Sequence, residues 1–438
     1  MTLISSSFNC KRTREDDSSN SVPDEAPGTW QSLMIGNEKG TRMIHPGTFP
    51  IGDSVDPVQL SKDPYTILSR MREREPVSRV AKFGMYYIVR HDDVTAVLRD
   101  DVNYGVGVES MLVYDTFGRH MMTVDGEEHN RYRLAARAPF TAKLIRERLE
   151  AKITETVDKL IDGFETDGRV EIRSAFASRL PVQVMLAVFG LPAEDEPLLR
   201  KWYDAFEQAL GNYEWDPAVR QRGQQYVAEF KSHLTMRLEA YKGRSGETNL
   251  LAALVNDAPE RRLTDEEILR NALIIFFGGI STVEALVLNA LYALAMHPRT
   301  FDRVKRDPAL IPVTLEETVR WLSPVQAVTR HVRKEMTLRG VVFKEGDLVN
   351  CMIGSANRDA GVFIHPDVFD IDRPDLSRHI AFATGPHTCL GLQLARTEGR
   401  IALSRLFARF PGCRVDLKTT SLPEGYEFRQ PSRLDLVW

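Results

Sequence analysis

Apolar residues recur at intervals of three and four positions along most of the chain, which is the spacing of amphipathic helices. The spacing predicts helices over about residues 142–164, 194–211 and 217–242. Near 76–90 and again over 331–351, the chain carries the apolar alternation that predicts short strands. No repeat period is visible. We therefore expect one mainly α domain with small β-sheets rather than separable modules.

The longest apolar stretch, residues 272–296, is long enough to cross a membrane, for which about 20 residues suffice. Four polar residues interrupt it, namely Ser281, Thr282, Glu284 and Asn289. A helix that is apolar on nearly all sides but carries such groups is typical of the core of a large soluble protein. We therefore expect a buried central helix and no membrane span.

Composition and charge argue against several other classes of protein. The 438 residues carry a formal net charge of −4, and no basic cluster is interleaved with aromatic residues, so nucleic-acid binding is not expected. The four cysteines are scattered without a C-x-x-C pair, which speaks against a disulfide framework or a zinc site. Residues 1–28 are polar and lack an apolar signal core. The sequence thus predicts a cytoplasmic protein with a disordered tail over 1–28 and a single domain over 29–438.

The segment 382–391, Phe-Ala-Thr-Gly-Pro-His-Thr-Cys-Leu-Gly, combines a rigid turn with a cysteine. Gly385 and Pro386 favour a tight turn that presents Cys389 away from its own backbone. Apolar periodicity from Leu390 onward predicts a helix, and the positive end of that helix favours a thiolate at Cys389. The alternative is a buried structural cysteine, which does not require these features. The segment therefore suits a thiolate bound to a metal.

Two glycines interrupt the long apolar stretch. Gly278 and Gly279 each cost about 1 kcal/mol relative to Ala inside a helix, so another reason for them is expected. Thr282 follows Gly278 by four residues, so its hydroxyl lies over the bare patch where a small ligand would fit. Close helix packing, with Thr282 bonded to its own backbone, explains the pattern equally well. Beside a metal-bound thiolate, we favour an oxygen-binding groove.

Glu317 and Arg320 lie three positions apart in a helix suggested by Leu315, Val319 and Leu322. Such pairs share one helix face, are usually solvated and contribute only about 0.2–0.5 kcal/mol. By itself, this pair indicates no function.

The segment 382–391 resembles the haem-binding loop of the cytochrome P450 superfamily, Phe-x-x-Gly-x-His-x-Cys-x-Gly, and further matches extend over roughly residues 60–438. The resemblance implies a cytochrome P450-like fold and haem b with Cys389 as the iron ligand. Ala383 departs from the family pattern, which usually has Gly there. We expect the loss of backbone freedom at Ala383 to be tolerated.

The resemblance also implies roles for other residues. Thr282 would assist dioxygen activation, because Gly278–Val283 is similar to the central-helix motif Ala/Gly-Gly-x-Asp/Glu-Thr. Ser281 stands where the family has an acidic proton donor. A water held by Ser281, or Glu284 one turn on, is expected to deliver protons instead; the alternative is that Ser281 is merely tolerated and turnover is slower. Glu317 and Arg320 would join Arg373 in a buried structural network.

Two further sets of residues follow from the same resemblance. The residues expected to contact the haem are His129, Arg133, Gly278, Arg330, His379, His387 and Cys389. The residues expected to line the substrate pocket are Phe276, Phe277, Ile280, Val325 and Val328.

The function implied is that of a haem-thiolate monooxygenase. It would use dioxygen and electrons from a separate ferredoxin or flavodoxin and its reductase to oxidise a small or medium lipophilic organic molecule. Arg131, Arg137, Lys143 and Arg146 would form a docking patch for an acidic ferredoxin, and a solvated cationic face is an equal alternative. Two other functions stay open: a peroxide-dependent peroxygenase, which tolerates a weak proton relay, and a non-catalytic haem-thiolate ligand sensor.

Overall fold

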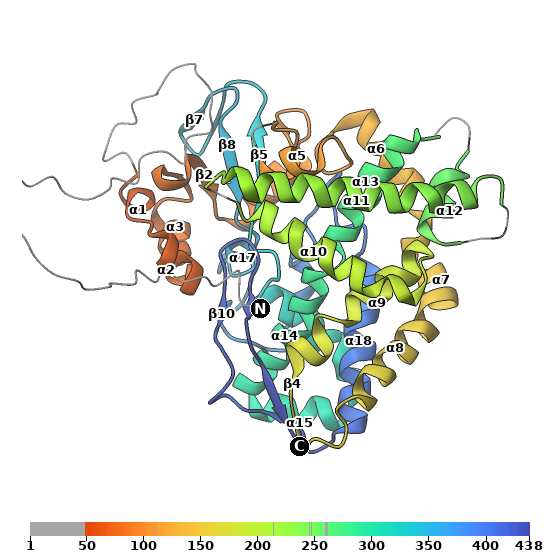
Figure 1. Ribbon diagram of the computed structural model, residues 1–438. Coiled ribbons are helices and arrows are strands. Elements are labelled where there is room, and N and C mark those ends of the chain that lie inside the picture. Colours follow the sequence, from red (N-terminus) through yellow and green to blue (C-terminus); the bar gives the residue numbers. More distant parts are fainter. Residues whose placement is uncertain (1–48, 110, 213, 245, 247, 259–261) are drawn as a thin grey trace, which may run out of the picture.

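The computed structural model describes residues 49–438 except 110, 213, 245, 247 and 259–261 (Figure 1). The predicted tail over 1–28, and the start of the predicted domain over 29–48, lie outside the described residues. Within the described part the protein is mainly helical with small β-sheets, so the predicted fold class is confirmed.

Helices make up most of the described chain, and most of their apolar faces meet in one core. Those of the first half are α1 (Pro50–Asp53), α2 (Pro57–Lys62), α3 (Pro64–Arg74), α4 (His91–Arg99), α5 (Leu112–Phe117), α6 (Gly126–Ala136), α7 (Ala142–Leu144), α8 (Glu150–Asp162) and α9 (Leu180–Phe189). Those of the second half are α10 (Glu196–Leu210), α11 (Pro217–Tyr241), α12 (Leu250–Val255), α13 (Asp265–Gly278), α14 (Ser281–Met296), α15 (Pro298–Arg306), α16 (Ile311–Trp321), α17 (Ile353–Ala356) and α18 (Leu392–Arg409).

The strands form small sheets beside the helices. The largest sheet has the order β1-β2-β8-β5-β3, in which β2 and β8 are parallel and the other neighbours are antiparallel. Its strands are β1 (Val77–Val80), β2 (Met85–Ile88), β3 (Tyr104–Gly105), β5 (Val328–Val332) and β8 (Leu348–Cys351). The smaller sheets contain β4 (Arg169–Glu171), β6 (Met336–Leu338), β7 (Val341–Phe343), β9 (Arg414–Val415), β10 (Pro423–Glu424), β11 (Gln430–Pro431) and β12 (Asp435–Val437).

Most elements predicted from the sequence are present with small shifts. The helix predicted over 194–211 is α10, and the one over 217–242 is α11. The segment 142–164 is helical but contains one wider π turn between α7 and α8. The helix after the cysteine loop begins at Leu392 rather than Leu390, because Gly391 forms its N-cap.

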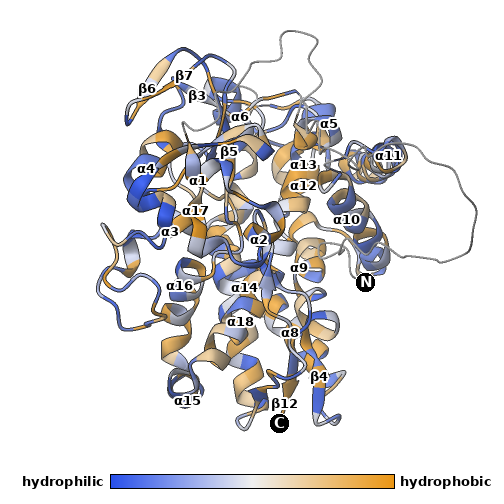
Figure 2. Cartoon of the chain, turned by 90° about the vertical axis from the view of Figure 1, so that its left-hand side faces the viewer, coloured by the Kyte–Doolittle hydropathy of each residue, from blue (hydrophilic) through white to orange (hydrophobic). Residues whose placement is uncertain are grey.

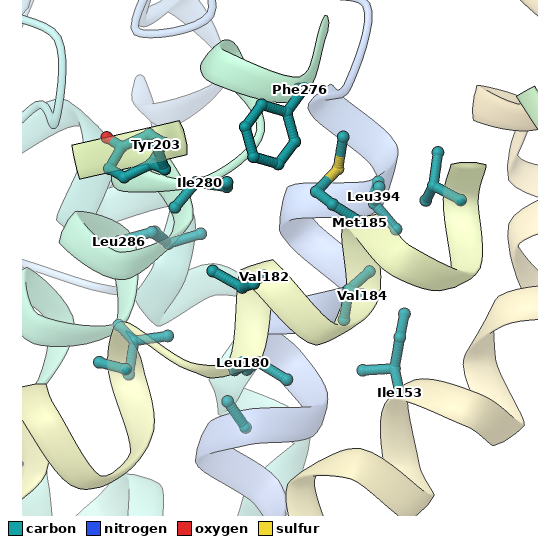
Figure 3. Close-up of a cluster of buried hydrophobic side chains, with 14 of the residues drawn as sticks. Ile153, Leu180, Val182, Val184, Met185, Tyr203, Phe276, Ile280, Leu286 and Leu394 are labelled. Atoms are coloured by element: carbon teal, nitrogen blue, oxygen red, sulfur yellow. The ribbon is translucent and has the colours of Figure 1, made fainter. Parts of the chain in front are cut away.

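The predicted central helix is two helices, α13 and α14, which meet at Gly279 and Ile280. Ile280 has φ −106° and ψ −75°, away from regular helix values. Two successive glycines lower the cost of such a break, because they contribute little to helix stability. The pair of helices packs against α9 and α18 in the interior, where Met185, Ile280 and Leu394 belong to one buried apolar cluster (Figure 3).

The segment Asp265–Met296 is long and apolar enough to cross a membrane by length and composition alone. However, 72% of its most apolar window is buried inside the protein. In Figure 2 the helices α12 and α13 are coloured as hydrophobic, whereas α4 at the edge of the fold is hydrophilic. Burial of this kind fits the core helix predicted from the sequence.

Gly279 brings α13 and α9 into close contact. A Cβ atom at Gly279 would lie 2.8 Å from the Met185 sulfur, whereas at Gly278 it would have no neighbour within 4 Å. Only one of the two glycines is therefore explained by helix packing.

We expect Gly279→Ala to lower the free energy of unfolding by about 1–3 kcal/mol, because Met185 is only 1% exposed and has little room to move. Gly278→Ala is the matched control and should change stability by less than about 1 kcal/mol. Denaturant unfolding of both variants measures the difference. Equal effects of the two substitutions would show that packing against Met185 does not explain Gly279.

Candidate active site

Cys389 lies in a loop that its own backbone hydrogen bonds hold in place. The Cys389 N–H donates to the Phe382 carbonyl oxygen at 2.9 Å. Gly385 has φ +76°, and a Cβ atom there would lie 2.4 Å from the Leu98 carbonyl oxygen. A side chain would therefore disrupt both the turn and its contact with α4. The loop is fixed between α4 and the start of α18.

Ala383 lies in the same loop with φ +56°, in the left-handed region that glycine favours. An L-residue in that region costs about 1–2 kcal/mol. A glycine there would lose about 0.5–1 kcal/mol of conformational entropy instead, which offsets part of the difference. The departure from the family pattern is therefore accommodated with modest local strain.

The Cys389 side chain is accessible to solvent although protein surrounds much of it. The surrounding protein raises the pKa of the thiol by burial. The Gly391 N–H and the charges of Arg133 and Arg396 act in the opposite direction but do not reverse the shift. A thiol in this position becomes a thiolate when a metal cation binds it.

Gly278 and Thr282 form a second open surface, on the central helices. Gly278 is exposed although its neighbours Phe276 and Phe277 are buried. The Thr282 hydroxyl donates to the Gly278 carbonyl oxygen at 2.9 Å. Both features of the glycine pattern are thus present: a bare patch at Gly278 and a threonine bonded to its own backbone.

Two arginines whose charges act on the cysteine loop, Arg133 and Arg330, have no carboxylate within ion-pair distance among the described residues. Arg330 on β5 is 8% exposed, and its Nη1 donates only to the adjacent Thr329 carbonyl at 2.8 Å. Arg133 on α6 is half-buried, and the charge of Cys389 acts on it. Burial lowers the pKa of both guanidinium groups. Buried cations of this kind call for an anionic partner.

His129 and His387 connect α6 to the cysteine loop. Their rings lie 4.0 Å apart between centroids. The ring nitrogens of His129 contact the Met121 carbonyl at 2.8 Å and the Pro386 carbonyl at 3.1 Å. His387 pairs through Nε2 with Asp125 at 2.9 Å. Burial acts to raise the pKa of Asp125, but His387 and other donors hold it at about 2.

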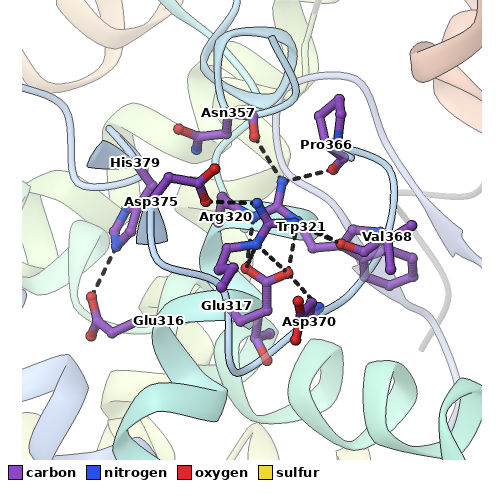
Figure 4. Close-up of polar contacts among 12 residues, drawn as sticks. Glu316, Glu317, Arg320, Trp321, Asn357, Pro366, Val368, Asp370, Asp375 and His379 are labelled. Carbon is purple, nitrogen blue, oxygen red and sulfur yellow. Dashed lines mark hydrogen bonds and ion pairs between the residues drawn. The ribbon is translucent and has the colours of Figure 1, made fainter. Parts of the chain in front are cut away.

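His379 uses both ring nitrogens within the protein. Its Nε2 pairs with Glu316 at 2.9 Å, and its Nδ1 accepts from the Ala381 N–H at 3.3 Å (Figure 4). Arg396 on α18 binds the same carboxylate at 2.7 Å. These protein partners do not test the haem contact predicted for His379, which stays a prediction.

Glu317, Arg320 and Arg373 meet in one buried network (Figure 4). The Glu317 carboxylate accepts from Arg320 Nε at 2.6 Å and from Arg373 Nε at 3.2 Å. Arg320 also donates to the Pro366 carbonyl at 2.7 Å and the Val368 carbonyl at 3.0 Å. The network fixes the segment before the cysteine loop on α16, because each buried charge has several partners.

Ser281 and Glu284 lie on α14 in different surroundings. Ser281 is half-buried and lies close enough to Tyr203 to act on its phenol. Glu284 is 4% exposed and pairs with Arg173 at 2.6 Å, with Gln430 donating to it at 3.2 Å. Burial raises the pKa of Glu284. The proton-delivery roles predicted for both residues stay predictions.

The residues predicted to line a substrate pocket fall into two groups. Phe276 and Ile280 are each 1% exposed, and Phe277 stacks on Tyr203 with 5.7 Å between ring centroids. These three belong to the packed core, because helix periodicity turns them away from the face of Gly278 and Thr282. Val325 and Val328 are half-buried.

These features fit the haem expected from the sequence. The sulfur and the bare surfaces at Gly278 and Gly391, where an added Cβ would meet nothing within 4 Å, leave room for a flat group. Arg133 and Arg330 supply two cations for its two propionates. Cys389 would hold the iron.

Sequence reasoning missed several polar residues near the site. Asp125 lies four positions before His129, and Glu316 lies directly before Glu317, so a search for carboxylates beside the predicted residues would have found both. Tyr203 and Glu207 lie four positions apart on α10, a spacing found on many solvated helices. Nothing in the sequence indicates that α10 meets Ser281.

Comparison with known proteins gives one family. The cytochrome P450 family model matches residues 65–308 and 309–422. The cytochrome P450 monooxygenase PikC of Streptomyces venezuelae is 32% identical over 82% of this chain and 87% of its own length.

Two solved structures are also similar. P450BioI, in complex with an acyl carrier protein ligated to hexadec-9Z-enoic acid, has a TM-score of 0.79 and 26% identity over 87% of this chain and 99% of its own. CYP109E1 from Bacillus megaterium, in complex with testosterone, has a TM-score of 0.76 and 28% identity over 86% of this chain and 99% of its own.

We expect Arg330→Met to have opposite effects on the protein without and with haem. Removing an uncompensated buried cation should stabilise the haem-free protein by about 1 kcal/mol or more. Loss of a charged hydrogen bond, worth about 1.5–3 kcal/mol, should release haem about 10–100 times faster. Denaturant unfolding and haem transfer to an acceptor globin measure the two effects.

Arg339→Met is the control, because Arg339 is exposed and pairs with Asp93 away from the cysteine loop. It should change both quantities little. If Arg330→Met destabilised the haem-free protein and left haem release unchanged, Arg330 would be a structural residue.

Proposed function

Because the chain belongs to the cytochrome P450 family and is a monooxygenase, we propose that it holds haem b through Cys389 and oxidises a small or medium lipophilic organic molecule with dioxygen. The observation that carries this proposal is the accessible Cys389 side chain in a loop held against α4, together with the bare, exposed surface of Gly278 on the central helices. Thr282 stands beside the glycine.

Each group of the proposed site has a task that its chemistry supports. Haem supplies electron-driven activation of dioxygen, which a thiolate ligand favours. Arg133 and Arg330 bind and orient the propionates by charge. The Thr282 hydroxyl can break its hydrogen bond to the Gly278 carbonyl oxygen. It can then hold a proton on the side of the site where dioxygen would bind.

The substrate class is supported by the lining and by the relatives. Val325 and Val328 offer half-buried apolar surface. CYP109E1 binds testosterone, and the carrier protein bound to P450BioI bears a long-chain acid. Both of those molecules are lipophilic. We extend this class of substrate, and no single compound, to the present protein.

Separate electron donors, a ferredoxin or flavodoxin with its reductase, are part of the proposal. Arg137, Lys143 and Arg146 are exposed near α6 and α7, on the side of the molecule that holds Arg133. A cationic surface of this kind suits an acidic carrier. Arg131 contributes less, since its guanidinium is bound to Glu267.

A cytoplasmic location is also proposed. The three cysteines among the described residues are free, and two of them, Cys351 and Cys413, are buried. Free thiols suit a reducing compartment.

The peroxygenase alternative rests on Ser281, which replaces the acidic residue of the family motif. A peroxide-dependent enzyme needs less proton delivery, because peroxide brings oxygen that is already reduced. The two routes differ in their source of oxygen. Labelled dioxygen therefore distinguishes them.

With ferredoxin, reductase and thioanisole as the oxidisable probe, we expect one oxygen atom of labelled dioxygen in the sulfoxide and the other in water. Thr282→Ala should release at least about twice as much hydrogen peroxide per electron, and Thr282→Ser should resemble the wild type because it keeps the hydroxyl. Mass spectrometry and peroxide assays measure both. Sulfoxide formed only when hydrogen peroxide is added would contradict the dioxygen route.

A further inference from the structure

We propose that Asp125, the residue before α6, is a positioning residue for the haem. Its carboxylate would fix His387 of the cysteine loop as a hydrogen-bond donor to one propionate. The inference rests on the haem binding proposed above, and it assigns Asp125 a role that is exerted through another residue rather than on the haem itself.

Asp125 stands at the start of a helix without capping it. It is the N-cap residue of α6, and an aspartate in that position usually accepts a hydrogen bond from the first turn of its helix. The Asp125 side chain makes no such bond. Both of its oxygens instead contact other parts of the chain, so the carboxylate has a task outside α6.

The Asp125 carboxylate is held by donors from three segments that are distant in sequence. Its Oδ1 pairs with His387 Nε2 at 2.9 Å, and its Oδ2 accepts from the Val106 N–H at 3.0 Å and from Arg333 Nη2 at 2.5 Å. Val106 follows β3, and Arg333 follows β5. The Asp125 side chain is only 9% exposed. A buried carboxylate with donors on both oxygens is fixed in one orientation.

Asp125 connects the elements that carry most of the predicted haem contacts. Those contacts are His129 and Arg133 on α6, Arg330 on β5 and His387 in the cysteine loop. Asp125 directly precedes α6, bonds to a residue just after β5 and pairs with the cysteine loop. The position of the cysteine loop relative to α6 and β5 therefore depends on this one side chain.

His387 is the residue through which Asp125 would act. A carboxylate only accepts hydrogen bonds, so the ring nitrogen that faces Asp125, Nε2, carries a hydrogen. The other nitrogen, Nδ1, has no hydrogen-bond partner among the described residues and can donate to a propionate when it also carries a hydrogen. A carboxylate on each side of the ring favours that form. The His129 ring, 4.0 Å away between centroids, limits movement of the His387 ring.

The simpler alternative is that Asp125 only ties the loops together. Its pair with Arg333 fits that alternative, because the arginine is 39% exposed and such pairs contribute little. The two accounts differ in one respect. A positioning residue affects haem binding only while His387 is present, whereas a structural tie affects it in either case.

A double-mutant cycle with Asp125→Asn and His387→Phe separates the two accounts. The rate of haem transfer to an acceptor globin is measured for all four proteins at one pH and one salt concentration. With His387 present, Asp125→Asn should release haem at least about tenfold faster, as expected for the loss of a charged hydrogen bond. In the His387→Phe protein, the same substitution should accelerate release less than about threefold. Equal factors in both backgrounds would overturn the proposal.

Asp93→Asn is the matched control. The Asp93 side chain is also 9% exposed and pairs with an exposed arginine, Arg339. This substitution should leave haem release within about twofold of the wild-type rate, since it removes only that pair. If Asp93→Asn accelerated release as much as Asp125→Asn, the loss of any buried carboxylate would explain the effect, and the positioning role would be wrong.

Arg333→Met disturbs the same carboxylate without replacing it, which covers the case in which Asp125→Asn does not fold. The substitution removes one donor of Asp125 and changes an exposed side chain. It should accelerate haem release at least about twofold while His387 is present and leave the His387→Phe protein unchanged. An acceleration that is absent, or equal in both backgrounds, would contradict the proposal.

Resonance Raman spectra report on the propionates directly, because their bending bands shift when a hydrogen bond to them is lost. Asp125→Asn and His387→Phe should shift the same band, and Asp93→Asn should not. An unshifted band in Asp125→Asn would overturn the positioning role even if the enzyme oxidises thioanisole. A wild-type protein that takes up no haem would instead contradict the proposed function.

Discussion

The rest of the structure depends on one constraint, which is that several ionisable groups inside the fold lack a partner of opposite charge. The protein raises the pKa of the Cys389 thiol, so a thiolate there requires a cation. Arg133 and Arg330 show the reverse case, as cations without a carboxylate in ion-pair distance among the described residues. A group with a metal at its centre and carboxylates at its edge satisfies both demands at once. The polypeptide and haem are therefore complementary in charge before shape is considered.

The surrounding fold keeps these unsatisfied groups in position. Glu317, Arg320 and Arg373 fix the segment that leads into the cysteine loop, and Gly385 lets that loop approach α4. In the central helices, the two glycines before the break between α13 and α14 have separate tasks. Gly279 permits contact with α9, and Gly278 presents a bare, exposed surface.

Much of this arrangement follows from the sequence, and the reasons for the exceptions are physical. Local patterns were sufficient for α10, α11, the turn at Gly385 and the position of Cys389, because periodicity and backbone preference act over a few residues. The break at Ile280 was missed, since apolar periodicity continues through it. Contacts between residues that are distant in sequence could not be predicted either. Nothing in residues 194–211 indicates that Tyr203 lies near Ser281. Phe276 was predicted in the pocket and lies in the core, because the orientation of a helix is set by what packs around it.

The most direct test of the central claim is the absorption spectrum of the reduced carbon monoxide complex after loading with haem. The wild-type protein and Cys413→Ala, which removes a buried cysteine outside the loop, should both give the spectrum of thiolate-ligated iron. Cys389→Ala should not. If Cys389→Ala bound haem with an unchanged spectrum, the sulfur of residue 389 would not be the iron ligand, and the charge complementarity between polypeptide and haem would lose its central contact.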